Sequence, residues 1–320
     1  MSGRVYARSV LRIGKSTLAV SLPKAWAKAR GLRPGDVLFV AETPDGALLI
    51  RTSKPGEERR SKALLEIKEG EKGAIERLLI ALYEAGYDVI RVVGKPSLSE
   101  EARREIRRVL RRLSGLEIIE ESYEYMLLQC FLNPKALNVE RTLERMEAIV
   151  RLMLQDLRRC ALEREPSLAK PIAERDDDLD RFFFLLCRQV NLALRVPSIA
   201  PELGLEDSTL AMPVLSYGKV LERMGDVLAS MAIYVSSTHR LPSREDLSVM
   251  EEGFRRAVRT FKLGDEASMR AVSRIYDEYA SRGDICQDVL KMLMCNFLSL
   301  CLDVIEVYAE MKAIRWPLLG

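Results

Sequence analysis

Several residue types are rare in this chain of 320 residues, and each scarcity excludes a class of protein. Histidine occurs once, as His239, which excludes a ferritin-type di-iron site built on Glu-x-x-His motifs and argues against a histidine-rich zinc site. The six cysteines include no Cys-x-x-Cys pair, so we interpret them as reduced core residues. Aromatic residues make up 6% of the chain and charged residues 30%, a balance that favours ion-paired helices over a β-sandwich.

Long apolar runs are also missing. The longest, such as residues 227–235, are far too short to cross a bilayer, and the N-terminus carries Arg and Lys without the apolar stretch of a signal peptide. We therefore expect a soluble, cytoplasmic protein with no membrane insertion. A phosphate-binding loop is excluded as well, because the glycine required five residues before Gly14 of the GKS sequence is replaced by Ser9.

Acidic residues are absent from residues 1–35, which hold eight basic side chains, although the formal net charge of the whole chain is only +3. Clustered positive charge without compensating acids indicates an anionic partner. The pattern of residues 1–53 predicts short strands around one helical stretch, which Gly31 ends before a type II turn at Pro34-Gly35. Because so short a segment has a marginal core of its own, we expect it to need a partner chain.

The order of these pieces is specific: a basic strand, a strand ending in LPKAW, a short helix, the stretch GLRPGDVLFV and a final ALLI strand. This series resembles the AbrB/SpoVT family. The resemblance implies a small barrel-like dimer, in which two chains swap hairpins, and DNA binding by basic residues. The matching residues are Arg4, Arg8, Arg12, Lys15, Lys24, Lys28 and Arg30. An alternative stays open, namely a dimerisation barrel with a solvated basic face, since some relatives of this fold bind a protein partner.

Residues 54–138 predict a small α+β domain in the order β-α-β-α-β-β, entered through a charged linker. Its second helix opens with a capping box at Ser99 or Ser97. The arginines of this helix alternate with Glu101 and Glu105, so we expect them to form a solvated face. No catalytic motif is recognisable, and a spacer or ligand-sensing role is our hypothesis.

Residues 139–320 are helical throughout by their apolar periodicity. Prolines and glycines divide them into six helices, which can arrange as two three-helix bundles. The predicted helices cover about residues 139–164, 168–195, 208–238, 243–262, 265–281 and 284–313. The whole chain is thus predicted as a multi-domain α+β protein with an N-terminal β-barrel, a middle α+β unit and an all-α region.

Two pairs of carboxylates lie in line with rows of apolar side chains on two of these helices. Asp176 and Asp180 continue an apolar line along one helix, and Glu222 and Asp226 lie mid-helix in the next. Gly225 would let another helix approach closely. Ionised carboxylates near a core need raised pKa values or a cation between them. Four converging carboxylates suit a hard cation, such as iron, magnesium, manganese or calcium.

The acidic residues also have an ordinary explanation. If Pro171 opens the helix, Asp176 and its neighbours lie in the first turns, where the helix dipole stabilises acids without a metal. Glu222 and Asp226 cannot be explained by a helix start. The residues alone leave both interpretations open.

The segments ERDDDLDRFFFLLCRQ and VLERMGDVLASMA resemble the two signature helices of PhoU proteins, which regulate phosphate uptake. The likeness covers roughly residues 139–312 and implies two repeated bundles whose paired E/D-x-x-x-D motifs face bound metal. The matching metal ligands are Asp176, Asp180, Glu222 and Asp226. In the second bundle Ser299 stands where the motif has Glu, while Asp303 remains, so we expect one metal-binding bundle.

The combination of domains resembles the archaeal PhoU-related regulators. We expect a homodimeric transcriptional regulator of phosphate uptake that binds operator DNA and a metal, with a phosphate-transport or signalling protein as a further partner. One alternative is an adaptor that acts on a phosphate transporter or sensor kinase without binding DNA. Another is a metal-dependent hydrolase. Because no nucleophile–base arrangement is visible, we predict that the protein is not an enzyme.

Overall fold

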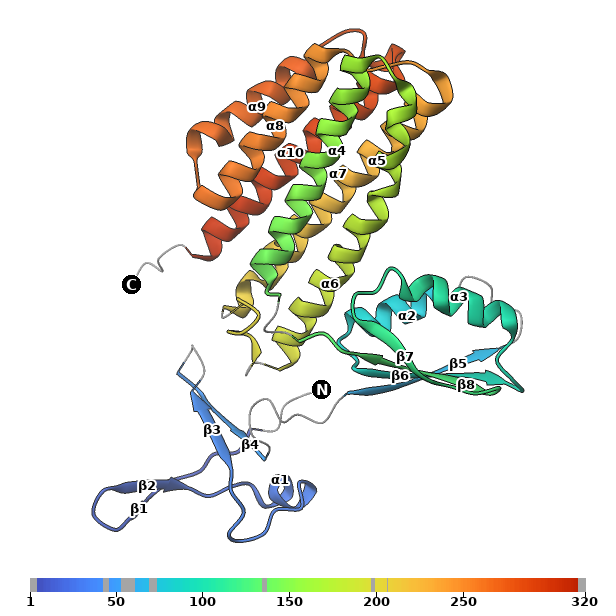
Figure 1. The fold of residues 1–320 in the computed structure, drawn as a ribbon. Helices are drawn as coiled ribbons and strands as arrows, with labels where there is room; N and C mark the ends of the chain where they lie inside the picture. Colours follow the sequence, from blue (N-terminus) through green and yellow to red (C-terminus); the bar gives the residue numbers. More distant parts are fainter. Residues whose placement is uncertain are drawn as a thin grey trace. The chain divides into compact units, whose positions relative to one another are not determined.

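A computed structural model describes residues 5–42, 46–52, 61–68, 74–133, 137–196, 199–205 and 207–315. The chain divides into two compact units, residues 1–59 and residues 60–320. Figure 1 shows small hairpins in the first unit, and a sheet and a large helical region in the second. The predicted fold class is confirmed: short N-terminal hairpins, then a small α+β unit, then long helices.

The first unit contains two antiparallel hairpins and one short helix. They are β1 (Val10–Ile13) with β2 (Thr17–Val20), α1 (Lys24–Ala29), and β3 (Phe39–Glu42) with β4 (Leu48–Arg51). Gly31 ends the helical stretch at φ +65°, and Gly35 adopts φ +95°, as the predicted type II turn requires. The local predictions for this segment are therefore confirmed.

No described residue of the first unit is buried. Its strands instead expose apolar side chains, among them Leu18, which is 69% exposed, and Val40, which is 58% exposed. The two hairpins do not pair with each other, because each forms its own two-stranded sheet. One copy of this segment therefore leaves its apolar surface uncovered, and closure of a barrel by a second chain stays a prediction.

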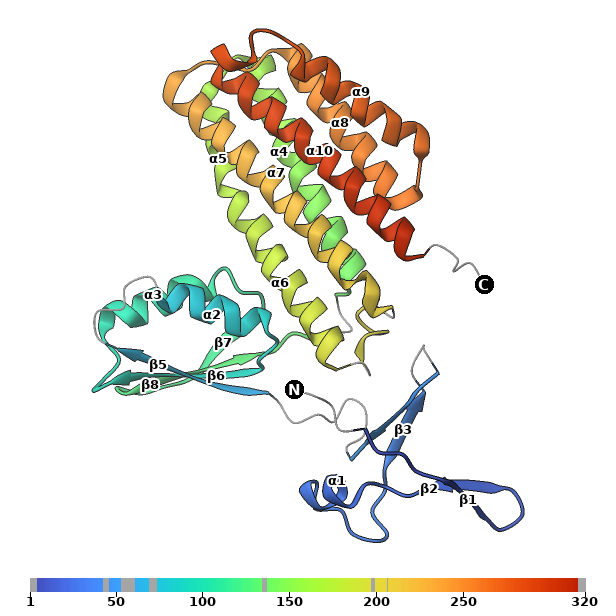
Figure 2. The same cartoon turned by 180° about the vertical axis from the view of Figure 1, so that it is seen from behind.

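The second unit begins with a four-stranded sheet covered by two helices. Its elements are β5 (Lys62–Lys68), α2 (Ala74–Glu84), β6 (Val89–Lys95), α3 (Glu100–Leu110), β7 (Leu116–Glu121) and β8 (Tyr125–Cys130). The strand order is β5-β6-β8-β7, with β5 and β6 parallel and the other pairs antiparallel. Figures 1 and 2 show α2 and α3 on one face of this sheet. Leu79, Ile90 and Ile106 are fully buried between the two layers.

The predicted order of elements in this α+β unit is confirmed, but the expected solvated face of α3 is wrong for two arginines. Ser99 caps α3 by accepting a hydrogen bond from the Ala102 amide at 3.2 Å. Arg103 is only 8% exposed and donates to Glu121 and to backbone carbonyls. Arg112, just past α3, reaches the helical region. Spacing alone marked these side chains as surface residues, whereas partners from distant segments hold them inside.

Six long α-helices and one short α-helix make up most of the described remainder of the second unit, with short 3-10 turns between them. The α-helices are α4 (Val139–Glu163), α5 (Lys170–Glu174), α6 (Asp176–Arg195), α7 (Ala211–Thr238), α8 (Arg244–Leu263), α9 (Glu266–Ala280) and α10 (Val289–Ile314). The predicted second helix is interrupted at Arg175, so that α5 ends there and Asp176 begins α6. The other predicted helices match within a few residues.

The helices form two sets of three, α4 with α6 and α7, and α8 with α9 and α10. Contacts of α7 with α10 and of α4 with α8 join the sets around one continuous hydrophobic core. Among the described residues, α10 alone is long and apolar enough to cross a membrane by length and composition. In the helical region α10 packs against α7, α8 and α9, and its buried residues, among them Met294 and Phe297, belong to the hydrophobic core.

Candidate metal centre and nucleic-acid interface

The four predicted metal ligands lie on α6 and α7, which pack against each other. Asp176 opens α6 and Asp180 follows one turn later, while Glu222 and Asp226 lie in the middle of α7. At Gly225 an added Cβ atom would come within 2.9 Å of Asp176 Oδ1. Glycine at this position therefore leaves room for the Asp176 carboxylate between the helices.

These carboxylates lie at the edge of the buried face of each helix, and not in the buried row of side chains that the sequence predicted. On α6 the fully buried residues include Leu179 and Leu186, whereas Asp176 and Asp180 are half-buried. On α7 Asp226 is exposed, while Met224 and Met231 are fully buried in a helix that packs against α4, α6 and α10. Periodicity finds candidate stripes along a helix, but the neighbouring helices decide which stripe is covered.

Asp176 lies near enough to the other three carboxylates for their charges to act on it. Burial, followed by the charges of Asp180, Asp226 and Glu222, raises the pKa of Asp176 to about 7. Its Oδ1 atom is buried and has no hydrogen-bond partner among the described residues. Near neutral pH the Asp176 carboxyl is therefore only partly ionised unless a cation is present.

Asp180 has a cation supplied by the protein. The Arg112 guanidinium donates through Nη2 to Asp180 Oδ2 and through Nη1 to Glu76 Oε1, the latter at 2.5 Å. Burial raises the pKa of Asp180, and Arg112 opposes this rise. The α+β unit therefore contributes directly to the charge balance of the carboxylate cluster.

The negative charge of Glu222 is only partly balanced by a neighbouring cation. Lys219 Nζ donates to Glu222 Oε1 at 2.6 Å, but Oε2 is buried without a hydrogen-bond partner among the described residues. Burial raises the pKa of Glu222, and Lys219 opposes this rise. Asp226 is more exposed, yet its charge raises the pKa of Asp176, Asp180 and Glu222, so it belongs to the same cluster.

The cluster fits a hard cation in its donor chemistry. All four side chains offer carboxylate oxygens, which such ions prefer, and two of these oxygens are buried without partners. Within the part of the chain that the structure describes, however, no three or more His, Cys, Asp and Glu residues form a ready metal site. A cation entering the cluster would have to compete with Arg112 and Lys219 for Asp180 and Glu222.

Sequence reasoning missed both internal cations. Lys219 precedes Glu222 by three residues, a helical spacing at which opposite charges meet, so the pattern could have indicated this pair. Arg112 is separated from Asp180 by 68 residues, and nothing in the local sequence connects them. This contact follows only from the docking of the α+β unit on α6.

In the second set of helices, the acidic residue that remains of the metal-binding motif is Asp303, and it forms an ion pair. Asp303 of α10 accepts from Arg223 Nη1 of α7 at 3.3 Å, and Ser299 donates to the Asn296 carbonyl at 2.7 Å. Asp303 therefore joins the two sets of helices through an ion pair. A single metal-binding bundle stays a prediction.

The predicted DNA-binding side chains lie in the first unit, and those that are described are all exposed. Arg4 lies outside the described residues. Among the described residues none of the other six takes part in an ion pair. They are Arg8, Arg12, Lys15, Lys24, Lys28 and Arg30. Their charge is thus free to act on an anionic partner, which is what phosphate binding requires.

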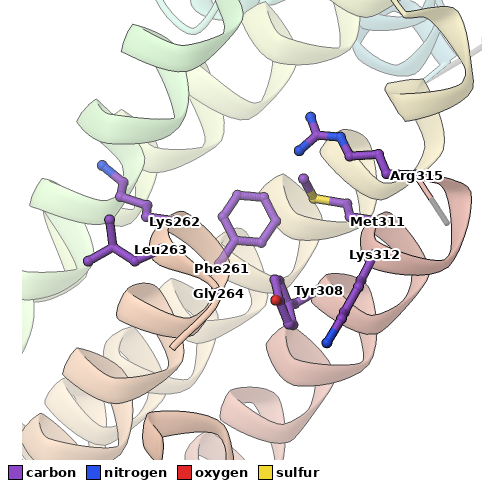
Figure 3. Close-up of a pocket in the computed structure, with 8 residues that line it drawn as sticks. All are labelled: Phe261, Lys262, Leu263, Gly264, Tyr308, Met311, Lys312 and Arg315. Carbon is purple, nitrogen blue, oxygen red and sulfur yellow. The ribbon is translucent and has the colours of Figure 1, made fainter. Parts of the chain in front are cut away.

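A separate hollow of about 620 Å³ lies between the C-terminal ends of α8 and α10 (Figure 3). Phe261 and Tyr308 contribute aromatic rings to it, and Lys262 and Lys312 contribute cations. Lys262 already pairs with the buried Glu147 at 3.0 Å, and Lys312 pairs with Glu266 at 3.3 Å. Because these cations are committed to the fold, we assign no ligand to the hollow.

Two segments of the chain match known protein families. Residues 143–235 match the PhoU domain, and residues 11–58 match the antidote-toxin recognition MazE family of bacterial antitoxins. Neither the curated proteins nor the solved structures contain a significant match. The protein therefore combines a PhoU domain with a MazE-type, AbrB-like domain in one chain, as the motifs of the two segments predicted.

The PhoU match begins in α4 and ends in α7. It includes all four carboxylates of the cluster and stops before the second set of helices, in which the motif is incomplete. Both families are regulatory. A PhoU domain suggests regulation of phosphate homeostasis, and a MazE-type domain suggests a DNA-binding regulator.

Proposed function

We propose that the protein is a cytoplasmic, homodimeric, DNA-binding regulator of phosphate uptake and homeostasis whose PhoU domain binds a metal ion. The observation that carries this proposal is the presence of both regulatory domains in one chain. The first supplies exposed cations that form no ion pair among the described residues, and the second supplies a carboxylate cluster with two buried oxygens that have no hydrogen-bond partner in the described part of the chain. No catalytic step is part of the proposal, because both families are regulatory.

DNA binding is supported by the charge of the first unit. Proteins that neutralise several phosphates release counterions, so their affinity falls steeply with salt. If about six to ten phosphates are contacted, affinity for a duplex from the protein's own promoter should fall by about 10³-fold or more between about 50 and 200 mM salt. Fluorescence anisotropy with labelled duplex measures this slope.

The residues responsible are tested by replacing Arg8 and Arg12 with Ala together, which should weaken binding and flatten the salt slope. Replacing Arg270 and Arg274 of α9 with Ala removes the same charge from an exposed helix of the other unit and should leave binding unchanged. Absence of any affinity at low salt would reject DNA binding and favour the adaptor.

Dimer formation is supported by the exposed apolar strands of the first unit. A segment of this size with no buried described residue cannot offset the entropy of ordering its chain. A second copy that pairs with these hairpins would cover the apolar side chains. The first unit then serves both to dimerise and to present a doubled set of cations to DNA.

Metal binding is supported by the unpaired oxygens of Asp176 and Glu222 and by the mutual effects of the four carboxylates on their pKa values. We propose that Asp176, Asp180, Glu222 and Asp226 hold a hard cation, for which iron, magnesium, manganese and calcium are the candidates. Such an ion would supply the positive charge that lets all four carboxylates ionise together.

Elemental analysis of natively purified protein tests this site. Glu222→Ala with Asp226→Ala should abolish the metal content. The matched control is Asp177→Ala with Asp178→Ala. These two residues lie in the same turn of α6 as Asp176, and their side chains are 78% and 54% exposed. Equal metal in both double variants would rule out the proposed ligands.

An adaptor remains the second candidate, because the family that matches residues 11–58 is described by recognition of a protein, a toxin. In this case the first unit would dimerise and contact a protein, while the PhoU domain would act on a phosphate transporter or signalling protein. The DNA measurement above separates the two candidates. A metal-dependent hydrolase would require phosphoesterase activity that is lost on Asp180→Ala, which we do not expect.

A further inference from the structure

Among the described contacts that attach the α+β unit to α6, which include a hydrogen bond from Arg195 to the Ala85 carbonyl, two differ clearly in their chemistry. The first is Arg188, which is 3% exposed. Its guanidinium donates to the carbonyls of Tyr83 and Tyr87 at 2.9 and 2.8 Å and to Asp88 Oδ1 at 2.9 Å. Asn191 adds a hydrogen bond to the Glu84 carbonyl at 2.9 Å. Removing a buried arginine from such partners is costly, so this attachment is permanent.

The second place is the ion pair between Arg112 and Asp180. The side chain of Arg112 is 27% exposed and that of Asp180 is 18% exposed. Arg112 divides its guanidinium between Asp180 and Glu76 of its own α+β unit; its buried Nε atom has no hydrogen-bond partner among the described residues and lies 3.9 Å from Asp177 Oδ1. If another cation binds Asp180, Arg112 can retain its ion pair with Glu76. This attachment can therefore be released at low cost.

The two attachments are well separated along the same helix. Asp180 and Arg188 are eight positions apart, which corresponds to about 12 Å along α6. Release of the Arg112–Asp180 contact thus leaves the Arg188 contacts in place. The end of α3 can move while the start of β6 stays docked against α6.

The Arg112 guanidinium also places its positive charge at Asp180, where a bound metal ion would place its own. Asp180 Oδ2 can accept from the guanidinium or bind a cation, and two positive charges at one carboxylate repel each other. We propose that Arg112 is the internal counter-ion of the carboxylate cluster: it occupies Asp180 when no metal is bound and is displaced when metal enters.

This inference rests on the proposed metal site and adds its regulation. Since coupling between two binding events is reciprocal, docking of the α3 end weakens metal binding, and bound metal weakens docking of the α3 end by the same factor. The α+β unit, for which the sequence indicates no catalytic motif, then reports whether the PhoU domain holds a metal.

The experiment uses full-length protein freed of metal by a chelator and titrated with Mn²⁺, with free Mn²⁺ measured by electron paramagnetic resonance. Arg112→Gln removes the competing charge, so its Mn²⁺ affinity should exceed that of the unmodified protein by about tenfold, within the usual range of coupling. Arg112→Lys keeps the charge and should bind Mn²⁺ less tightly than Arg112→Gln. Arg108→Gln, which loses a 3.5 Å contact with the same Glu76, should leave affinity unchanged.

Hydrogen exchange supplies a readout independent of affinity. In the unmodified protein, Mn²⁺ should speed exchange of the amides around residues 107–116 and leave those around residues 186–193 unchanged. In Arg112→Gln these amides should exchange fast with or without Mn²⁺.

The outcomes separate the two proposals. If the unmodified protein binds Mn²⁺ and Arg112→Gln binds it equally or more weakly, the counter-ion role is overturned while the metal site stands. Unchanged exchange at residues 107–116 on Mn²⁺ binding overturns it as well. If neither protein binds Mn²⁺, the proposed metal site itself is wrong and the counter-ion role falls with it.

Discussion

The two units of this chain differ in how far one copy of the sequence can bury its apolar residues. In residues 1–59 no described residue is buried, and strand residues such as Leu18 and Val40 are 69% and 58% exposed. Residues 60–320 enclose two hydrophobic cores with many fully buried side chains. One copy of the chain therefore covers the apolar cores of the second unit, whereas it leaves apolar strand surface of the first unit exposed.

The largest expected effect concerns assembly. Replacing Leu18 and Val40 together with Asp places charges on the apolar strands of the first unit, so the protein should change from dimer to monomer. Light scattering should then give about half the mass, and circular dichroism should show the helices intact. Ile233→Asp, at a residue of α7 that is 61% exposed, should leave the mass unchanged. Dissociation by Ile233→Asp alone would place the interface in the second unit instead.

The next effect concerns the interior of the second unit. Arg188→Ala removes three hydrogen bonds of a buried guanidinium, to the Tyr83 and Tyr87 carbonyls and to Asp88 Oδ1, so the unfolding free energy should fall by about 3 kcal/mol. Arg195→Ala serves as the control, because Arg195 is exposed and donates only to the Ala85 carbonyl; its effect should stay below about 1 kcal/mol. Urea unfolding followed by circular dichroism measures both. Equal losses in the two variants would contradict a buried anchor.

A smaller effect concerns pH. The pKa of Asp176 is about 7 in the folded protein, against an ordinary value of 3.8. The folded state therefore holds a proton that the unfolded state has lost between these values, and stability decreases as pH rises through this range. In metal-free protein the melting temperature should fall from about pH 4 to pH 7, and Asp176→Asn should reduce that fall. Parallel pH profiles of the two proteins would refute the burial of Asp176.

The smallest effect is expected at the surface of the same unit. Arg159 and Glu163 form an ion pair at 2.7 Å on α4, with side chains 62% and 47% exposed. Exposed pairs of this kind contribute little, so Arg159→Ala should change the unfolding free energy by no more than about 0.5 kcal/mol. Urea unfolding checks this value. A loss above about 1 kcal/mol would mean that surface charges, and not the cores, stabilise the second unit.

Most of the fold was predictable because its signals are local. Apolar periodicity, prolines and glycines marked the long helices, and Gly31 and Pro34-Gly35 marked the turns of the first unit. The break at Arg175 was not predicted, since Arg175 keeps helical dihedral angles of φ −73° and ψ −16° and carries no breaking residue type. Such small interruptions depend on tertiary packing more than on propensity.

The candidate site was predictable only in part. The four-residue spacing of Asp176 with Asp180 and of Glu222 with Asp226 correctly placed each pair on one helix, and the structure brings the two helices together. The exposure of Asp226 was not foreseen, because spacing gives the relative direction of side chains and not the position of the neighbouring helices.

The sequence by itself determined the order of elements, the basic character of the first unit and the presence of paired carboxylates on two helices. Only the tertiary structure decided which of those carboxylates are buried and that Arg112 lies against Asp180. The physical reason is the range of the interactions. Helix formation and turns depend on residues a few positions apart, whereas charge balance in a buried cluster depends on groups brought together from distant segments.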